Sequence, residues 1–189
     1  EGRYKDENYV ALTTRAYREA IDRAMKEVGW DGCRDQGYVA GEVPTDKQSL
    51  EQVYSRGLGP HFMSGVNHQT VVDGRAPRHR GVKIGSVRRI ALNQVVVEST
   101  LEKDALKPGD GIVFDAANWR SPEDKEEGGN VFGVESLGQD EFALSFGEGK
   151  VDFQRIRPGD LVWRTSDPAV NRSAKVLSSG RDVRMTRPI

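Results

Sequence analysis

The stretch 81–100, GVKIGSVRRIALNQVVVEST, is the clearest indication of the fold in this chain. It contains two runs rich in valine and isoleucine, 82–90 and 94–100, and the turn signal Leu92-Asn93 stands between them. β-Branched residues favour extended strands, and a short break between two such runs is typical of strands joined by a turn. The stretch therefore predicts two short, consecutive strands.

Four further runs of the same kind follow, again separated by glycine- and aspartate-bearing turn signals. The runs are GIVFDA (111–116), VFGVES (131–136), EFALSF (141–146) and DLVWRT (160–165). Six short strands without intervening helices favour a small antiparallel barrel over a βαβ fold. Closure also removes exposed strand edges. We therefore predict an α+β, mainly β, fold, with a barrel preceded by an N-terminal helix and a Gly/Arg-rich connector.

One internal sequence repeat supports the barrel. LKPGDGIVF (106–114) and IRPGDLVWR (156–164) share an apolar–basic–Pro-Gly-Asp–strand pattern. Proline presets φ for a turn, glycine adopts positive φ, and the aspartate bonds nearby backbone before the strand begins. We interpret the sequence repeat as a repeated turn rather than as a catalytic repeat.

Helices are expected on either side of the strands. Apolar residues recur at helical spacing from Ala16 to Val28, and Gly29 is a natural stop. A short second helix is predicted just after Thr45-Asp46, and a third just after Asp167-Pro168, followed by a loose tail. We predict three regions: 1–45, the helix and connector at the edge of a missing catalytic domain; 46–168, a short helix and the barrel; and 169–189, a tail or linker.

Composition narrows the class of protein. The chain has 189 residues and a net charge of −1, and its single cysteine, Cys33, excludes an internal disulfide. No apolar run approaches the roughly 20 residues of a membrane-spanning helix, and no signal peptide is visible at the charged start. These features predict a cytoplasmic setting and no membrane partner. Because the first residue is Glu1, we expect an excised piece or a processed chain.

Basic side chains are concentrated at the end of the Gly/Arg-rich connector, residues 57–81, and in the first predicted strand that follows it. From Arg75 to Arg89 there are six arginines and lysines and no acidic residue. Planar guanidinium groups there could contact phosphates, while aromatic side chains such as His61, Phe62 and Tyr54 stack on unpaired bases. The alternative is that the arginines bond loop carbonyls and the acidic loop 123–127. The candidate substrate-binding residues are Tyr54, Arg56, Arg75, Arg78, Arg80 and Lys83.

Other chemistry in the connector has weaker support. His61, His68 and Asp73 could hold a metal, and Ser55 or Ser64 could join His68 and Asp73 in a hydrolytic triad. No GxSxG elbow accompanies the triad. Neither a GxxxxGK[ST] loop nor a strand–GxGxxG–helix pattern is present, so nucleotide binding in those modes is not expected.

The same connector resembles a known family. The segment Tyr54-Ser55-Arg56-Gly57, followed by His79-Arg80-Gly81 and the strand VKIGSV, is similar to the U32 peptidase family, the collagenase-like group. The helix containing Ala16-Tyr17-Arg18 is similar to the helix that leaves the catalytic region of that family. The resemblance spans about 14–167.

The resemblance implies a parent larger than this chain. The family's catalytic core is a TIM-barrel-like domain with a cysteine-bearing signature that this sequence lacks. Some members are implicated in hydroxylating RNA bases with clustered cysteines. The resemblance therefore implies an accessory, noncatalytic region downstream of that barrel, with no cofactor of its own, although an iron–sulfur cluster could lie in the missing domain. The implied partners are the TIM-like barrel of the same parent and an RNA or polypeptide substrate.

Two alternatives stay open. One is a stand-alone hydrolase that uses His68 and Asp73. The other is a protein-interaction module that uses the apolar stripe of the first helix.

Overall fold

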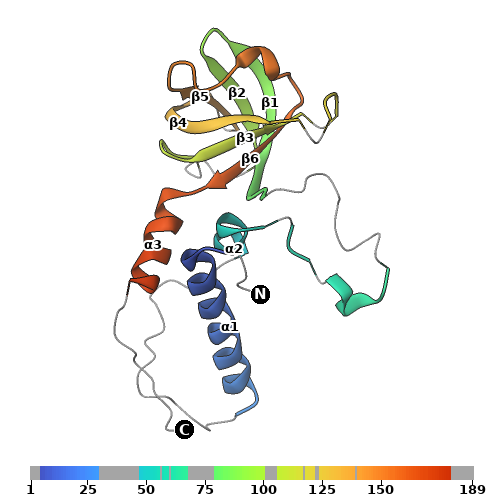
Figure 1. Ribbon diagram of the computed structural model, residues 1–189, viewed down its shortest axis with the longest axis vertical. Helices are drawn as coiled ribbons and strands as arrows, with labels where there is room; N and C mark the ends of the chain where they lie inside the picture. Colours follow the sequence, from blue (N-terminus) through green and yellow to red (C-terminus); the bar gives the residue numbers. More distant parts are fainter. Residues whose placement is uncertain are drawn as a thin grey trace.

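The structure, a computed structural model, describes residues 5–29, 47–55, 57–59, 61–67, 79–100, 106–116, 118–121, 124–138 and 140–179. It contains a closed β-barrel with helices gathered at one end (Figure 1). The predicted fold class, mainly β with an N-terminal helix, is confirmed.

Six strands form the barrel, and all six predicted strands are confirmed. Around the barrel their order is β1-β2-β5-β4-β3-β6, and every neighbouring pair is antiparallel. The core is a cluster of buried aliphatic and aromatic side chains, including Ile84, Ile112, Phe114, Leu144 and Val162. The strands are β1 Val82–Ala91, β2 Gln94–Ser99, β3 Gly111–Asp115, β4 Glu127–Ser136, β5 Glu141–Phe146 and β6 Leu161–Ser166.

Strand β4 begins four residues earlier than the sequence pattern indicates. Gly128-Gly129 reads as a turn, yet both residues lie within the strand and pair with β3. A Cβ atom at Gly128 would lie 2.3 Å from the carbonyl oxygen of Ile112. The glycine therefore allows close approach of two backbones rather than a turn.

The repeated sequence pattern corresponds to an approximate twofold symmetry of the barrel. Exchanging β1 with β4, β2 with β5 and β3 with β6 leaves the strand order unchanged. In the first turn the N–H of Gly109 donates to the carbonyl of Val131 (2.8 Å). In the second turn the N–H of Gly159 donates in the same way to Val87 (2.8 Å). Both glycines have positive φ, 95° and 91°, so the Pro-Gly-Asp segments are equivalent turns.

The two turns lie at opposite ends of the barrel. Each turn immediately precedes a strand, β3 or β6, and these strands are antiparallel neighbours in which Gly111 pairs with Ser166. Since β6 leads directly into α3, turn 106–110 lies at the helix end (Figure 1). Turn 156–160 lies at the opposite end, which we call the far end.

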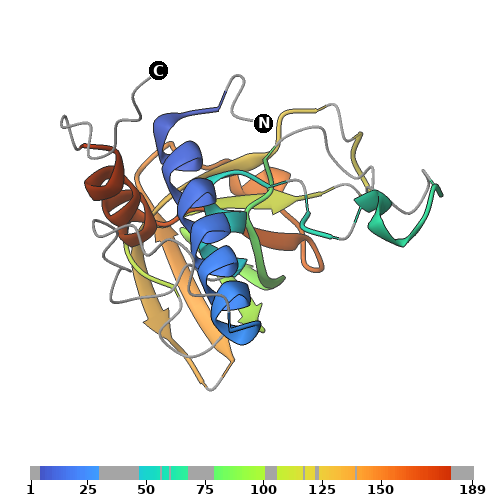
Figure 2. The same ribbon diagram turned by 90° about the horizontal axis from the view of Figure 1, so that it is seen from below.

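Within the described residues, three α-helices cover the helix end, and short 3-10 turns lie at His61–Ser64 and Phe153–Arg155. Helix α1 (Glu7–Glu27) packs against α3 (Pro168–Ser178) and α2 (Lys47–Val53), and its long axis can be followed in Figure 2. Both longer helices have aspartate N-caps: Asp6 accepts from the N–H of Tyr9 and Asp167 from that of Ala169. Within the described residues, no helix has the length and apolarity needed to cross a membrane.

Candidate functional site

The structure describes three of the six predicted contact residues. Tyr54 and Arg80 lie at the junction between the helices and the barrel, and Lys83 lies on the barrel wall. Arg56, Arg75 and Arg78 lie outside the described residues. His68 and Asp73 also lie outside them, so the stand-alone hydrolase stays a prediction.

Tyr54 is part of an aromatic cluster. Its ring stacks on His79, with centroids 5.7 Å apart and planes at 17°, and meets Tyr9 of α1 edge-on at 6.1 Å. The ammonium group of Lys5 lies 3.1 Å from the centroid of the Tyr54 ring. The ring thus connects the start of α1 to the entry into the barrel.

His79 bridges the connector and the last strand. The N–H of Ser55 donates to Nδ1 (2.8 Å), and Nε2 lies 3.0 Å from the carbonyl oxygen of Thr165. Nε2 faces an acceptor and so carries a proton in this arrangement, while Nδ1 lies beside both the N–H and the carbonyl oxygen of Ser55 (3.2 Å). The imidazole therefore joins two segments that are far apart in the sequence.

We expect His79→Phe to lower the free energy of unfolding by about 2 kcal/mol, because both hydrogen bonds are lost while the stacking on Tyr54 is kept. Urea denaturation would measure the change. Phe62→Leu is the control, because this side chain is 54% exposed. Equal stability of His79→Phe and the native chain would contradict a bridging role.

Arg80 is buried rather than presented to solvent. Its guanidinium pairs with Glu126 (2.5 Å), lies 3.9 Å from the carboxylate of Asp115 and is stacked over Trp163 at 5.9 Å. Its backbone N–H donates to the carbonyl of Ser55 (2.8 Å). Arg80 thus bonds the acidic loop through Glu126, which is the alternative to phosphate contact that the sequence left open.

A second buried arginine, which sequence reasoning missed, fastens α2 to the barrel. Arg164 Nε donates to Gln52 Oε1 (2.8 Å), and Gln52 Nε2 donates to the carbonyl of Arg164 (2.8 Å). Gln52 is only 3% exposed. Arg164 ends the repeated segment 156–164, but nothing in the sequence links it to Gln52, because the two residues are 112 positions apart.

The charge of Arg164 also faces two carboxylates. Its Nη1 lies 3.8 Å from Asp110 and 3.6 Å from Asp167, the N-cap of α3. Burial raises the pKa of Asp110 above its ordinary value, although the N–H of Lys107 and the charge of Arg164 act in the opposite direction. Arg164 therefore connects α2, the first Pro-Gly-Asp turn and α3 at one point.

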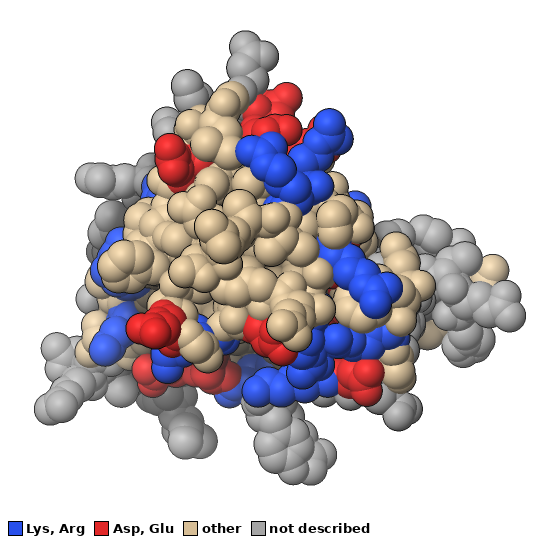
Figure 3. All heavy atoms as spheres, turned by 90° about the horizontal axis from the view of Figure 1, so that it is seen from above, with Lys and Arg blue, Asp and Glu red and all other residues tan. Residues whose placement is uncertain are grey.

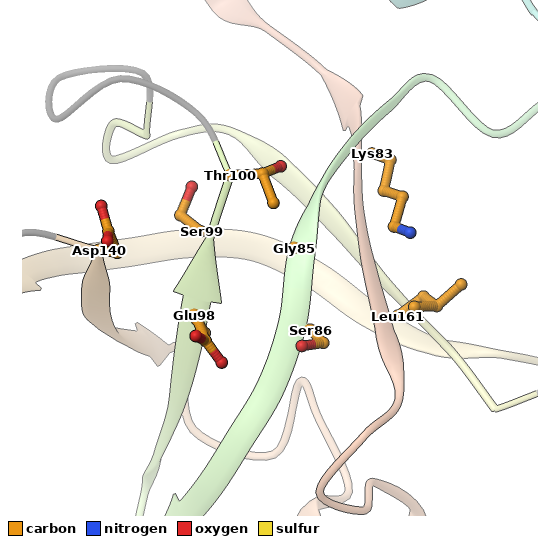
Figure 4. A pocket seen from close by; sticks show the side chains of 8 residues that line it. All are labelled: Lys83, Gly85, Ser86, Glu98, Ser99, Thr100, Asp140 and Leu161. Carbon is orange, nitrogen blue, oxygen red and sulfur yellow. The ribbon is translucent and has the colours of Figure 1, made fainter.

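Lys83 lines a separate surface hollow of about 470 Å³ between β1, β2 and β6. In Figure 4 the lysine lies across the hollow from Glu98 and Asp140. Two carboxylates beside one ammonium give this hollow no excess of positive charge, so it does not favour phosphate. Among the described residues there is no group of three or more His, Cys, Asp and Glu that could hold a metal.

The site is thus a junction made of interlocked side chains on a helix-bearing barrel. Residues 1–73 match the family model of peptidase family U32, and the resemblance inferred from the sequence is confirmed. The matched segment contains α1, α2 and Tyr54, which form the helical side of the junction.

Two curated relatives support the similarity to peptidase family U32. The chain is 33% identical over 119 residues to an uncharacterized protease from Methanocaldococcus jannaschii, which covers 60% of this chain and 26% of the relative. It is 27% identical over 188 residues to a 23S rRNA 5-hydroxycytidine synthase from Escherichia coli, covering 97% of this chain and 26% of the relative. The chain thus spans about a quarter of the length of these relatives.

Proposed function

We propose that this chain is the accessory, noncatalytic region of a U32-like protein, which docks on the catalytic domain and helps to hold a macromolecular substrate. The observation that carries the proposal is the junction. The segment that matches the family is fastened to the barrel by buried hydrogen bonds between Gln52 and Arg164 and by part-buried ones through His79. A barrel held in this way keeps a fixed position relative to the domain on which the helices pack.

The docking surface is the exposed face of α1. Tyr17 is 70% exposed and Ile21 49%, and together with Val10 they line a shallow hollow of about 720 Å³. Exposed apolar side chains grouped on one helix face are typical of a surface that packs against a partner. We assign this face to the catalytic TIM-like barrel of the same parent, since the relatives extend well beyond the part that this chain matches.

The names of the two relatives support the proposed substrate class. One is named as a protease and the other as an enzyme that modifies ribosomal RNA. Both act on macromolecules, which a separate barrel beside a catalytic domain is suited to hold. The proposed substrate is therefore a polypeptide or an RNA.

The double substitution Tyr17→Gln with Ile21→Gln tests the docking surface. In the 189-residue chain both side chains face solvent, so we expect the free energy of unfolding to change by less than about 1 kcal/mol. In the full-length parent the same change should cost about 3 kcal/mol or more, because each buried side chain of this size contributes roughly 1.5–3 kcal/mol. Chemical denaturation of both proteins measures the difference.

The control is Leu92→Gln at the fully exposed turn between β1 and β2. It should leave both proteins unchanged. If the double variant cost the parent no more than it cost the chain, this face of α1 would not be the docking surface.

A further inference from the structure

Two arginines and a tryptophan form a cluster at the far end of the barrel, away from the helices. The guanidinium carbon of Arg157 lies 3.9 Å from the ring centroid of Trp119, and that of Arg120 lies 4.7 Å from it. We call these three residues the Trp–Arg cluster. Figure 3 views the molecule from this end, where Lys and Arg side chains lie around the rim, mostly at the right and below, interspersed with Asp and Glu.

The cluster is held rigidly. The indole N–H of Trp119 donates to Asp160 Oδ1 (2.6 Å), so the ring cannot rotate without losing a hydrogen bond to a buried carboxylate. The other oxygen of Asp160 accepts from the backbone N–H of Arg157 (2.8 Å). The second Pro-Gly-Asp turn therefore fixes both the aromatic ring and the backbone of one arginine.

The symmetry of the barrel shows that the turn itself does not need this cluster. In the related turn, Lys107 and Asp110 occupy the places of Arg157 and Asp160, and the same backbone-to-carboxylate bond is present (3.0 Å). There the carboxylate faces Arg164 instead of an indole. The Trp–Arg cluster is thus an addition to one copy of a turn that forms without it.

The charges of the cluster are not neutralised within the described part of the chain. Within those residues, neither Arg120 nor Arg157 has a carboxylate within ion-pair distance, and both guanidinium groups lie over the Trp119 indole. Their neighbours differ, since Arg155 pairs with Glu127 at 3.1 Å and Arg80 with Glu126. Two cations that share one ring keep their N–H donors available for an anion.

We propose that the Trp–Arg cluster binds the phosphate backbone of single-stranded RNA. A nucleic acid strand carries a charge at every nucleotide and so supplies two adjacent anions, whereas a polypeptide does so only where acidic residues are grouped. Arginine forks bind phosphate oxygens through paired hydrogen bonds. The inference rests on the proposed function, from which it selects RNA as the substrate, and it places substrate contact at the end of the barrel opposite the docking helices.

Fluorescence anisotropy of a labelled 20-nucleotide single-stranded RNA, titrated with the 189-residue chain, tests the proposal. We expect Arg120→Gln with Arg157→Gln to weaken binding about 10-fold or more at low salt and to reduce the salt dependence by roughly 1.4 in log Kd per log salt, about 0.7 for each lost phosphate contact. Arg157 is exposed and Arg120 is half-buried, and neither has an ion pair among the described residues, so we expect the melting temperature to change little.

The matched control is Lys107→Gln, the symmetry-related position at the other end, which should bind RNA within about twofold of the native chain. Absence of RNA binding at low salt, an unchanged affinity in the double variant, or equal binding of labelled polyglutamate would each overturn the assignment. The docking proposal is measured on α1 in a separate experiment, so either can fail while the other stands.

Discussion

Gly81→Ala should lower the free energy of unfolding by about 4 kcal/mol or prevent folding altogether, because backbone strain and a backbone clash coincide there. Gly81 adopts a φ of 70°, which side chains other than glycine rarely tolerate. A Cβ atom would lie 2.0 Å from the carbonyl oxygen of Arg164. That carbonyl also accepts from Gln52, so movement away from the clash would open the junction.

Gly149→Ala separates the two causes. Gly149 has nearly the same φ, 68°, but a Cβ atom there would meet nothing within 4 Å. We expect this control to cost only about 1 kcal/mol, the strain of the left-handed conformation alone. Urea denaturation followed by circular dichroism would measure both variants. Equal losses would show that close packing at Gly81 contributes nothing.

Arg164→Met should cost about 3–5 kcal/mol, the range observed when one member of a buried ion pair is removed. Asp110 would remain 1% exposed without its nearest cation, and Gln52 would lose the donor to its side-chain oxygen. Arg88→Met is the matched control. Its pairs with Glu98 and Glu141 are long and 60% of its side chain is exposed, so we expect a loss below about 0.5 kcal/mol.

The loss in Arg164→Met should also depend on pH. The pKa of Asp110 is already raised by burial, and removing Arg164 removes one of the influences that lower it. The folded state then binds the proton more tightly than the unfolded state. Stability should therefore fall as the pH rises from the ordinary aspartate value through the raised pKa, so the deficit is smaller in acid than at neutral pH.

Asp110→Asn introduced into Arg164→Met should recover part of the loss at neutral pH. The amide oxygen can still accept from the N–H of Lys107, while the buried charge is gone. Denaturation curves of the single and double variants between acidic and neutral pH measure both effects. A deficit independent of pH, with no recovery in the double variant, would rule out an uncompensated Asp110 as the cause.

Much of the barrel could be predicted because its information is local. Val95 to Val97 are all buried in β2, and this apolar run identifies a strand without reference to any other segment. The Pro-Gly-Asp turns could be predicted equally well, since proline, glycine and aspartate each act on adjacent backbone. Gly128 shows the limit of local information. The sequence pattern indicates a turn there, but the role of this glycine depends on how closely strand β3 approaches it.

The site was less predictable. The sequence pattern indicates exposed aromatic and basic side chains at Tyr54 and Arg80, yet in the structure both are held by neighbouring side chains at the junction. Whether an arginine faces solvent or an acidic loop depends on which loop folds over it. Trp119 lies between Asn118 and Arg120 in a loop that carries no sequence motif, and only the fold brings Arg157 to it.

The six strands, the repeated turns, the helix that ends near Gly29 and the likeness to peptidase family U32 could all be predicted from the amino-acid sequence, because each depends on residues close together in the chain. Which end of the barrel carries the helices, and how Gln52 meets Arg164, can be seen only in the folded chain. The fold also determines which arginines form ion pairs with carboxylates, as Arg80 and Arg164 do, and which do not within the described residues. Pairings between distant segments depend on closure of the barrel, and closure is a property of all six strands together.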